Sequence, residues 1–190
     1  MKKITFAALA VAAAMGVSSA AQAQETAPGA HPYAGVQVGL HNLGIDEDDF
    51  VGIPGLDIDD SALIYGAYAG VDFDIAQGAV IGVEGNFVLG NGPIDNEFGI
   101  AGRIGHRTAN GSVIYIRGGY QWINIDPSGL TGLNVTDAQF EAAGGDDTIG
   151  DYLVGVGADI STGGPARIRV AVDTISFDTL RATVGVNFGF

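Results

Sequence analysis

Arginine and carboxylate side chains recur at alternate positions of the sequence, with apolar or small residues between them. Arg167 and Arg169, for example, flank Ile168. In an extended strand, alternate side chains point to opposite faces, so these charges would share one face. Opposite charges on a confined face must pair, because an unpaired buried charge is costly. The pattern predicts an ion-pair network of Asp72, Glu84, Arg103, Arg117, Asp159, Arg169, Asp173 and Arg181.

A hydrolytic centre is a second chemistry for which the sequence holds candidates. Such a centre needs a nucleophile, a base and an orienting group together. Ser61 could approach His41 across the first hairpin, with Asp59 or Asp60 nearby as the orienting group. The combination is weak, so we expect no enzymatic activity, no catalytic residue and no cofactor.

Acidic residues are concentrated in two segments, which hold twelve of the 22 in the chain. Carboxylates at this density could bind Ca²⁺ or bridge divalent ions to surface lipids. However, the run Asp46-Glu47-Asp48-Asp49 lacks the spacing and central glycine of an EF-hand loop. We favour hydrated, like-charged loops and expect no bound metal. The first segment holds Asp46, Glu47, Asp48, Asp49, Asp57, Asp59 and Asp60, and the second, 124–150, holds Asp126, Asp137, Glu141, Asp146 and Asp147.

The first 23 residues have the order of a secretory signal peptide. Lys2 and Lys3 precede an apolar run over 4–17, and small residues then end in Ala21-Gln22-Ala23. The run is shorter than the roughly 20 residues that a membrane-spanning helix needs. We therefore expect cleavage after residue 23 and export from the cytoplasm. The chain has no cysteine, which excludes disulfides and a lipidated N-terminal cysteine.

The charge balance of the mature chain excludes nucleic acid as a partner. Both lysines lie in the leader, so six arginines remain against 22 acidic residues, a net charge of −16. A nucleic-acid binder needs a basic patch. The mean hydropathy is nevertheless positive at +0.28, although no apolar run after residue 23 is long enough for a spanning helix. This combination is typical of a β-structured membrane protein.

Eight segments alternate between apolar and polar or small residues, and each is near the ~9–11 residues of a tilted membrane strand. Short turns rich in Asn, Gly and Pro follow the second, fourth and sixth segments. Longer loops follow the first, third and fifth and, least clearly, the seventh. The segments are 33–42, 62–75, 79–90, 97–108, 112–124, 150–160, 166–176 and 179–190.

The polar phase of these segments is rich in glycine, lacks lysine and carries all six arginines. A solvated strand face usually carries lysine, threonine and glutamate, whereas the narrow interior of an eight-stranded barrel leaves little room for side chains. We therefore place the polar phase inside and the apolar phase against lipid. Glu84 and Arg103 are then expected to pair across neighbouring strands. Outward aromatic residues gather towards the two ends, as in membrane-interface girdles.

The chain ends on an alternating aromatic strand, with Val184, Val186, Phe188 and Phe190 in one phase. Most chains end in a polar, frayed tail. Together with Y-I-R-G-G-Y-Q-W at 115–122 and Y-L-V-G-V-G-A-D-I at 152–160, this strand resembles the small outer-membrane β-barrel family, the eight-stranded relatives of OmpA, OmpX and the opacity proteins. The resemblance covers 33–190 and implies that the last strand is the signal for the barrel-assembly machinery. No OmpA-type periplasmic domain follows, so cell-wall tethering is not expected.

The sequence thus predicts an all-β protein, an eight-stranded antiparallel transmembrane up-and-down barrel with short periplasmic turns and longer extracellular loops. A leader (1–23) and a short periplasmic segment (24–32) would precede the barrel (33–190). We expect localisation in the outer membrane, with membrane lipids, the assembly machinery and a surface ligand at the loops as partners. A structural or adhesion-like role with a plugged lumen is favoured. A narrow channel for ions or very small solutes is the alternative, and a lipid-modifying hydrolase the third.

Overall fold

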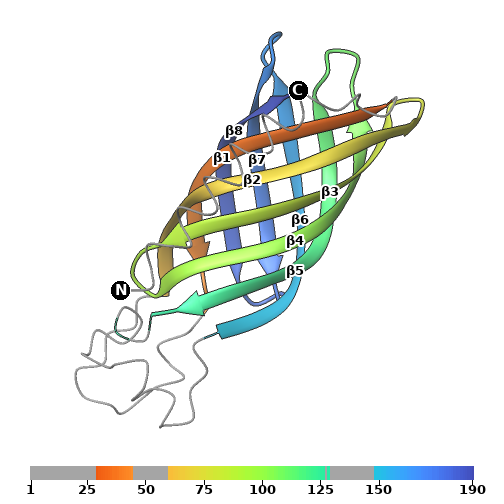
Figure 1. Ribbon diagram of the computed structural model, residues 1–190. Helices are drawn as coiled ribbons and strands as arrows, with labels where there is room; N and C mark the ends of the chain where they lie inside the picture. Colours follow the sequence, from red (N-terminus) through yellow and green to blue (C-terminus); the bar gives the residue numbers. More distant parts are fainter. Residues whose placement is uncertain (1–28, 45–59, 127, 129–147) are drawn as a thin grey trace.

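The computed structural model describes residues 29–44, 60–126, 128 and 148–190. These ranges form one closed barrel in which each strand pairs antiparallel with the next and β8 pairs with β1 (Figure 1). The predicted fold class is confirmed. The strands are β1 (Ala30–Asn42), β2 (Ser61–Ala76), β3 (Ala79–Gly90), β4 (Ile94–Arg107), β5 (Val113–Ile125), β6 (Thr148–Ser161), β7 (Ala166–Ile175) and β8 (Leu180–Gly189).

The first strand begins earlier than the alternation suggested. Ala30 pairs with Phe73 and His31 with Asp72, so the last residues of the expected periplasmic segment 24–32 belong to β1. The leader itself lies outside the described residues. Pro32 lies within β1 near its start, where a proline is tolerated in a strand.

The connections differ in length at the two ends of the barrel. The turns after β2, β4 and β6 are short and lie at the same end as the C-terminus (Figure 1). At the other end the long connections follow β1 and β5, whereas those after β3 and β7 are tight. The expectation of longer loops after the third strand and, least clearly, after the seventh is therefore wrong. Gly92, at φ 64°, closes the turn after β3, and β4 starts at Ile94 with a register shift before Asn96.

The strands are strongly staggered around the barrel. If one steps from each residue to its partner on the next strand, all the way around the barrel, the path returns to β1 ten residues away from where it began. A stagger of this size accompanies a large tilt of the strands. The path runs His41, Arg181, Asp173, Gly155, Arg117, Arg103, Gly82, Asp72 and His31. Most of the predicted network residues therefore lie on one spiral row inside the wall.

The two faces of the wall have opposite chemistry. Aliphatic side chains such as Val36, Ile114 and Val184 are exposed on the outer face, while the arginines at 103, 117, 169 and 181 are buried inside. The predicted placement of the polar phase inside is confirmed. Within the described ranges, no helix is long and apolar enough to cross a membrane.

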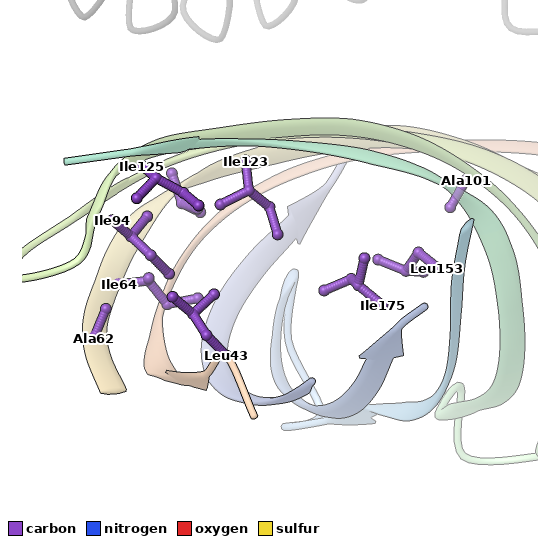
Figure 2. Packing of buried hydrophobic residues seen from close by; sticks show 10 residues of the cluster. Leu43, Ala62, Ile64, Ile94, Ala101, Ile123, Ile125, Leu153 and Ile175 are labelled. Atoms are coloured by element: carbon purple, nitrogen blue, oxygen red, sulfur yellow. The ribbon is translucent and has the colours of Figure 1, made fainter. Parts of the chain in front are cut away.

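The interior has two parts with different composition. We call the eight residues of the predicted network the charged layer. Towards the end with the long loops lies an aliphatic layer of fully or nearly buried side chains (Figure 2). It consists of Leu43, Ala62, Ile64, Val88, Ile94, Ala101, Ile123, Ile125, Leu153 and Ile175. The alternation predicted inward positions, but it gave no sign that one end of the lumen would be apolar.

Candidate functional site

Arg103 binds two carboxylates in the charged layer. Its Nε donates to Oδ1 of Asp72 at 2.6 Å, and its Nη2 donates to Oδ2 of the same residue. Its Nη1 donates to Oδ2 of Asp159 at 3.0 Å. Glu84, the predicted partner, lies 3.8 Å from Nη1 and accepts no hydrogen bond from Arg103. The predicted pair is therefore present as an ion pair, although the hydrogen bonds of Arg103 go to Asp72 and Asp159.

Glu84 is instead the centre of the layer. Its Oε1 accepts from Nη1 of Arg117 at 2.7 Å, and its Oε2 accepts from Nη1 of Arg169 at 2.5 Å and from the hydroxyl of Tyr33 at 2.7 Å. The glutamate is 3% exposed, so it depends on these partners for its charge to be tolerated. Tyr33 was not predicted as a member of the network.

Two arginines reach their carboxylates across a glycine on the strand between them. Arg103 on β4 faces Gly82 on β3, which faces Asp72 on β2. In the same way Arg117 on β5 faces Gly155 on β6, which faces Asp173 on β7. Arg117 holds Asp173 through two hydrogen bonds, at 2.7 and 2.6 Å.

The glycines in these rows have no room for a side chain. A Cβ at Gly155 would overlap Oδ1 of Asp173, and a Cβ at Gly82 would overlap Oδ1 of Asp72. The glycine between the charges is therefore what allows a bidentate pair to form between strands that are not neighbours. The repeated arrangement is an arginine–glycine–aspartate row across three strands.

Arg169 and Arg181 each pair with a carboxylate on the neighbouring strand and with one across the lumen. Nε and Nη2 of Arg169 donate to Asp159 at 2.7 and 3.0 Å. Arg181 donates to Asp173 at 3.2 Å and, through Nη1, to Oε2 of Glu97 at 2.8 Å. Glu97 is fully buried but was not predicted as a network residue. The alternation could have identified it, because residue 97 is an even number of positions from Arg103 and therefore faces the same side of the strand. It was missed because residue 97 was taken as the first residue of its strand.

His41 lies at the boundary between the charged and aliphatic layers. Its Nδ1 is 2.5 Å from Oε1 of Glu97, and its Nε2 is 3.2 Å from the hydroxyl of Thr179. Ser61 hydrogen-bonds to Asp60, at 3.0 Å, and lies on the outer phase of β2. The hypothetical grouping of Ser61 with His41 is therefore not assembled, because adjacent strand positions face opposite sides of the wall.

Three tyrosines surround the guanidinium groups. The carbon Cζ of Arg103 lies 4.4 Å from the ring centre of Tyr33 and 4.7 Å from that of Tyr115. The Cζ of Arg169 lies 4.0 Å from the ring centre of Tyr68. Cation–π contacts of this kind stabilise a desolvated arginine from the directions that its in-plane hydrogen bonds leave open. The arginines of the charged layer are thus packed against tyrosine rings as well as paired with carboxylates.

The remaining predicted sites lie at the ends and the outer surface. Val184, Val186, Phe188 and Phe190 all have exposed side chains, and the amide of Phe190 donates to the carbonyl of Pro32 at 3.2 Å. Of the acidic first loop only Asp60 lies in the described ranges, where it accepts from Asn42 at 2.7 Å. The other six acids of that loop lie outside them. The described residues contain no group of three or more His, Cys, Asp or Glu that could hold a metal ion.

The outer wall carries an apolar hollow of about 900 Å³. Its lining includes aliphatic outward side chains from several strands, among them Val38, Ile116, Val156 and Val172. The lining is otherwise made of glycine and alanine, with His106, Tyr115 and Thr183 as its polar residues. Its apolar character matches that of the outer face.

No model of a known protein family matches the chain, and no curated protein matches its sequence. Solved structures do match. The attachment invasion locus protein Ail of Yersinia pestis superposes with a TM-score of 0.51 at 10% identity, over 85% of this chain and 99% of Ail. This chain has the fold of a small outer-membrane β-barrel.

Two further barrels of this fold match at lower scores. The N-terminal barrel domain of OprF from Pseudomonas aeruginosa has a TM-score of 0.49 and 12% identity, over 85% of this chain and 98% of that domain. Neisserial surface protein A has a TM-score of 0.47 and 11% identity, over 85% of this chain and 97% of its own. At such identities the likeness concerns the barrel architecture and not the lumen residues.

Proposed function

We propose that the protein is an integral outer-membrane barrel with a closed lumen and a structural or surface-interaction role. The observation that supports this proposal best is that every arginine of the charged layer is paired with a carboxylate. Each of its four arginines is hydrogen-bonded to at least one buried carboxylate and is at most 4% exposed. An ion could pass only if several of these pairs separated, and separating them is costly in a confined interior.

The outer surface supports residence in a membrane. The exposed large side chains on the strands are mostly Val, Ile, Leu and Phe, and the four arginines of the charged layer are hidden from that face. An arginine on the lipid face would cost about 2–4 kcal/mol near the midplane. Aromatic residues cluster near the long-loop end, where Phe98 stacks on Trp122 at 5.0 Å and Tyr120 meets Tyr152 at 5.6 Å. Clusters of this kind suit the level of the lipid headgroups.

The charge of the chain limits the surface ligands that the loops could bind. One structure of Ail contains a heparin analogue, sucrose octasulfate. The present chain has no lysine after residue 3 and concentrates acidic residues in its two long loops. Like charges repel, so a sulfated polyanion is a poor candidate for this protein. A cationic surface, or one bridged by divalent ions, is the better candidate.

Single-channel recording in a planar bilayer tests the closed lumen. Folded wild-type protein, verified by its shifted migration on an unboiled gel, should give no current steps. Steady and reproducible steps would overturn the closed-lumen proposal and favour the narrow channel. A variant with Arg169→Ala and Glu84→Ala removes the centre of the charged layer. If it folds and conducts while the wild type is silent, the network is what closes the lumen.

Deletion of the long loops tests the surface role separately. A barrel shortened within 45–59 and 129–147 should fold and stay silent in the bilayer but lose attachment to target cells or matrix. Attachment that survives both deletions would contradict a role of the loops. The two experiments address different parts of the proposal, so one can fail while the other succeeds.

We also propose that β8 carries the assembly signal. The exposed alternation from Val184 to Phe190 leaves a row of outward apolar side chains at the closing strand. Deleting Phe190 should lower the fraction of protein that reaches the membrane in its heat-modifiable, folded form, whereas Phe190→Trp should preserve it. Because Phe190 does not enter the lumen, the unfolding free energy of the molecules that do assemble should change little. Full assembly of the deletion variant would refute this role.

A further inference from the structure

The turn between β7 and β8 has an unusual backbone for its residues. Ser176 and Phe177 both have positive φ angles, 59° and 67°. The amides of Asp178 and Thr179 both point to the carbonyl of Ile175 at 3.3 Å, which closes a tight turn. Positive φ at two successive positions is the geometry that Asn-Gly favours in two-residue hairpin turns. An aromatic side chain is an uncommon choice there, because its Cβ crowds the backbone.

Phe177 gains little from packing within the protein. At 75% exposure it is the most exposed large hydrophobic side chain in the part of the chain that the structure describes. The turn itself is held by other atoms, since the hydroxyl of Thr179 contacts both the amide and the carbonyl of Ile175 at 3.2 Å. Neither the turn nor the interior requires a phenylalanine at position 177.

The turn lies beside the aromatic cluster of the outer wall. The amide of Ser176 donates to the carbonyl of Tyr152 at 3.0 Å, which places the turn next to that strand position. Tyr152 is 70% exposed and its ring packs against Tyr120. Leu180, the first residue of β8, is also exposed on the outer face. Tyr152, Phe177 and Leu180, which we call the turn patch, are therefore exposed apolar side chains around a turn that adjoins the aromatic cluster.

We propose that the turn patch is a lipid contact, with Phe177 inserted among the outer-leaflet lipids at the level of their headgroups. Three observations favour lipid over a protein partner. The patch shares Tyr152 with the aromatic cluster of the outer wall, its three residues carry no cationic side chain, and Phe177 is followed by an exposed Asp178 that suits water. Aromatic residues are enriched at this depth of a membrane. A tight turn that ends at the interface would anchor the shortest hairpin of the barrel.

This inference rests on the membrane setting proposed above, and the chain offers a way to test the two separately. Trp122 is the only tryptophan and lies within the outward aromatic cluster. Its fluorescence in the wild type reports whether the barrel enters the bilayer. A second protein carrying Trp122→Phe and Phe177→Trp reports the turn. A third carrying Trp122→Phe and Gly164→Trp reports a turn at the other end, where an added Cβ meets nothing within 4 Å.

The measurement is quenching in phosphatidylcholine vesicles whose acyl chains are brominated near the carbonyl end. Insertion predicts that bromine quenches the wild type and the Phe177→Trp protein, and that acrylamide in water quenches the Phe177→Trp protein less than the Gly164→Trp protein. Quenching of the wild type without quenching of the Phe177→Trp protein would overturn the lipid contact and leave the membrane setting intact. If neither is quenched, the membrane setting fails as well. Protection from acrylamide that disappears when protein is diluted into excess lipid would indicate a second copy on the patch and would also overturn the proposal.

Discussion

The two layers of the lumen fill the same barrel by different means. In the charged layer, arginine side chains extend over a glycine on the adjacent strand and bind a carboxylate on the strand beyond it, which joins β2 with β4 and β5 with β7. In the aliphatic layer, mostly branched side chains, with two alanines, fill the space next to their own strands, and none of them makes a directional bond (Figure 2). Hydrophobic burial is non-directional, whereas bidentate ion pairs fix geometry. The charged layer therefore specifies which strands face one another, and the aliphatic layer mainly excludes water.

The largest expected difference between the layers comes from removing one charge. Arg103→Ala should lower the free energy of unfolding by about 3–5 kcal/mol, because it leaves Asp72 buried without its bidentate partner. Asp72 is fully buried, and among the described residues the other cation that pairs with it is Arg107, at 3.8 Å. Urea titration of the protein in lipid vesicles measures the change. An unchanged value would mean that water enters the lumen and solvates the carboxylate.

Two further variants make that experiment decisive. Arg107→Ala removes a pair at the rim with Asp74, a carboxylate that is 37% exposed. It also removes the 3.8 Å contact with Asp72 but leaves that carboxylate its bidentate partner Arg103, so it should cost only about 0.2–1 kcal/mol. The double variant Arg103→Met with Asp72→Leu replaces the buried pair by apolar side chains and should recover most of the loss. If the double variant is as unstable as Arg103→Ala, packing rather than the unpaired charge explains the effect.

A smaller loss of stability should follow from adding a side chain at the glycine between the two residues of an ion pair. Gly155→Ala places a Cβ where the Asp173 carboxylate lies and within 2.8 Å of the carbonyl of Val172. Overpacking of this kind costs about 1–3 kcal/mol. Gly118→Ala is the matched control, because that glycine is on the outer face and its added Cβ would be 3.8 Å from the nearest atom, the carbonyl oxygen of Leu153. Equal stability of the two variants would contradict the role of the glycine in the arginine–glycine–aspartate row.

The alternation of the sequence was sufficient to predict the wall of the barrel. Successive residues of a strand face opposite sides, so the phase of Arg117 or Asp173 follows from counting alone. The hydrogen-bond partners could not be predicted in this way. The predicted ion pair of Glu84 and Arg103 is present at 3.8 Å, but it was inferred from neighbouring strands alone. The stagger places Gly82 opposite Arg103 and allows its guanidinium to hydrogen-bond to Asp72 one strand further away. The stagger is a property of the closed barrel and is not encoded in any one strand.

The aliphatic layer was missed for a different reason. Ile64 and Val88 are inward, yet an apolar residue in the polar phase looks like an irregularity when one strand is read alone. Only when the strands are placed side by side in register do these inward apolar residues fall at the same height in the barrel. Glu97 and Tyr33 were lost in a similar way, since both lie near the end of an expected segment, where boundaries are least certain.

The smallest expected effect tests whether the aliphatic layer tolerates change. Ile64→Val removes one methylene from a side chain that has no exposed surface and should cost about 0.5–1.5 kcal/mol, as cavity formation does in well-packed cores. Ile100→Val makes the same change on the outer face, where the side chain is 55% exposed and lipid can fill the gap, so its stability should change less. Because no partner is orphaned, Ile64→Val should also add to Arg103→Ala without coupling. A loss as large as that of Arg103→Ala, or strong coupling between the two, would show that the layers act as one unit and that the aliphatic side chains help to hold the ion pairs in register.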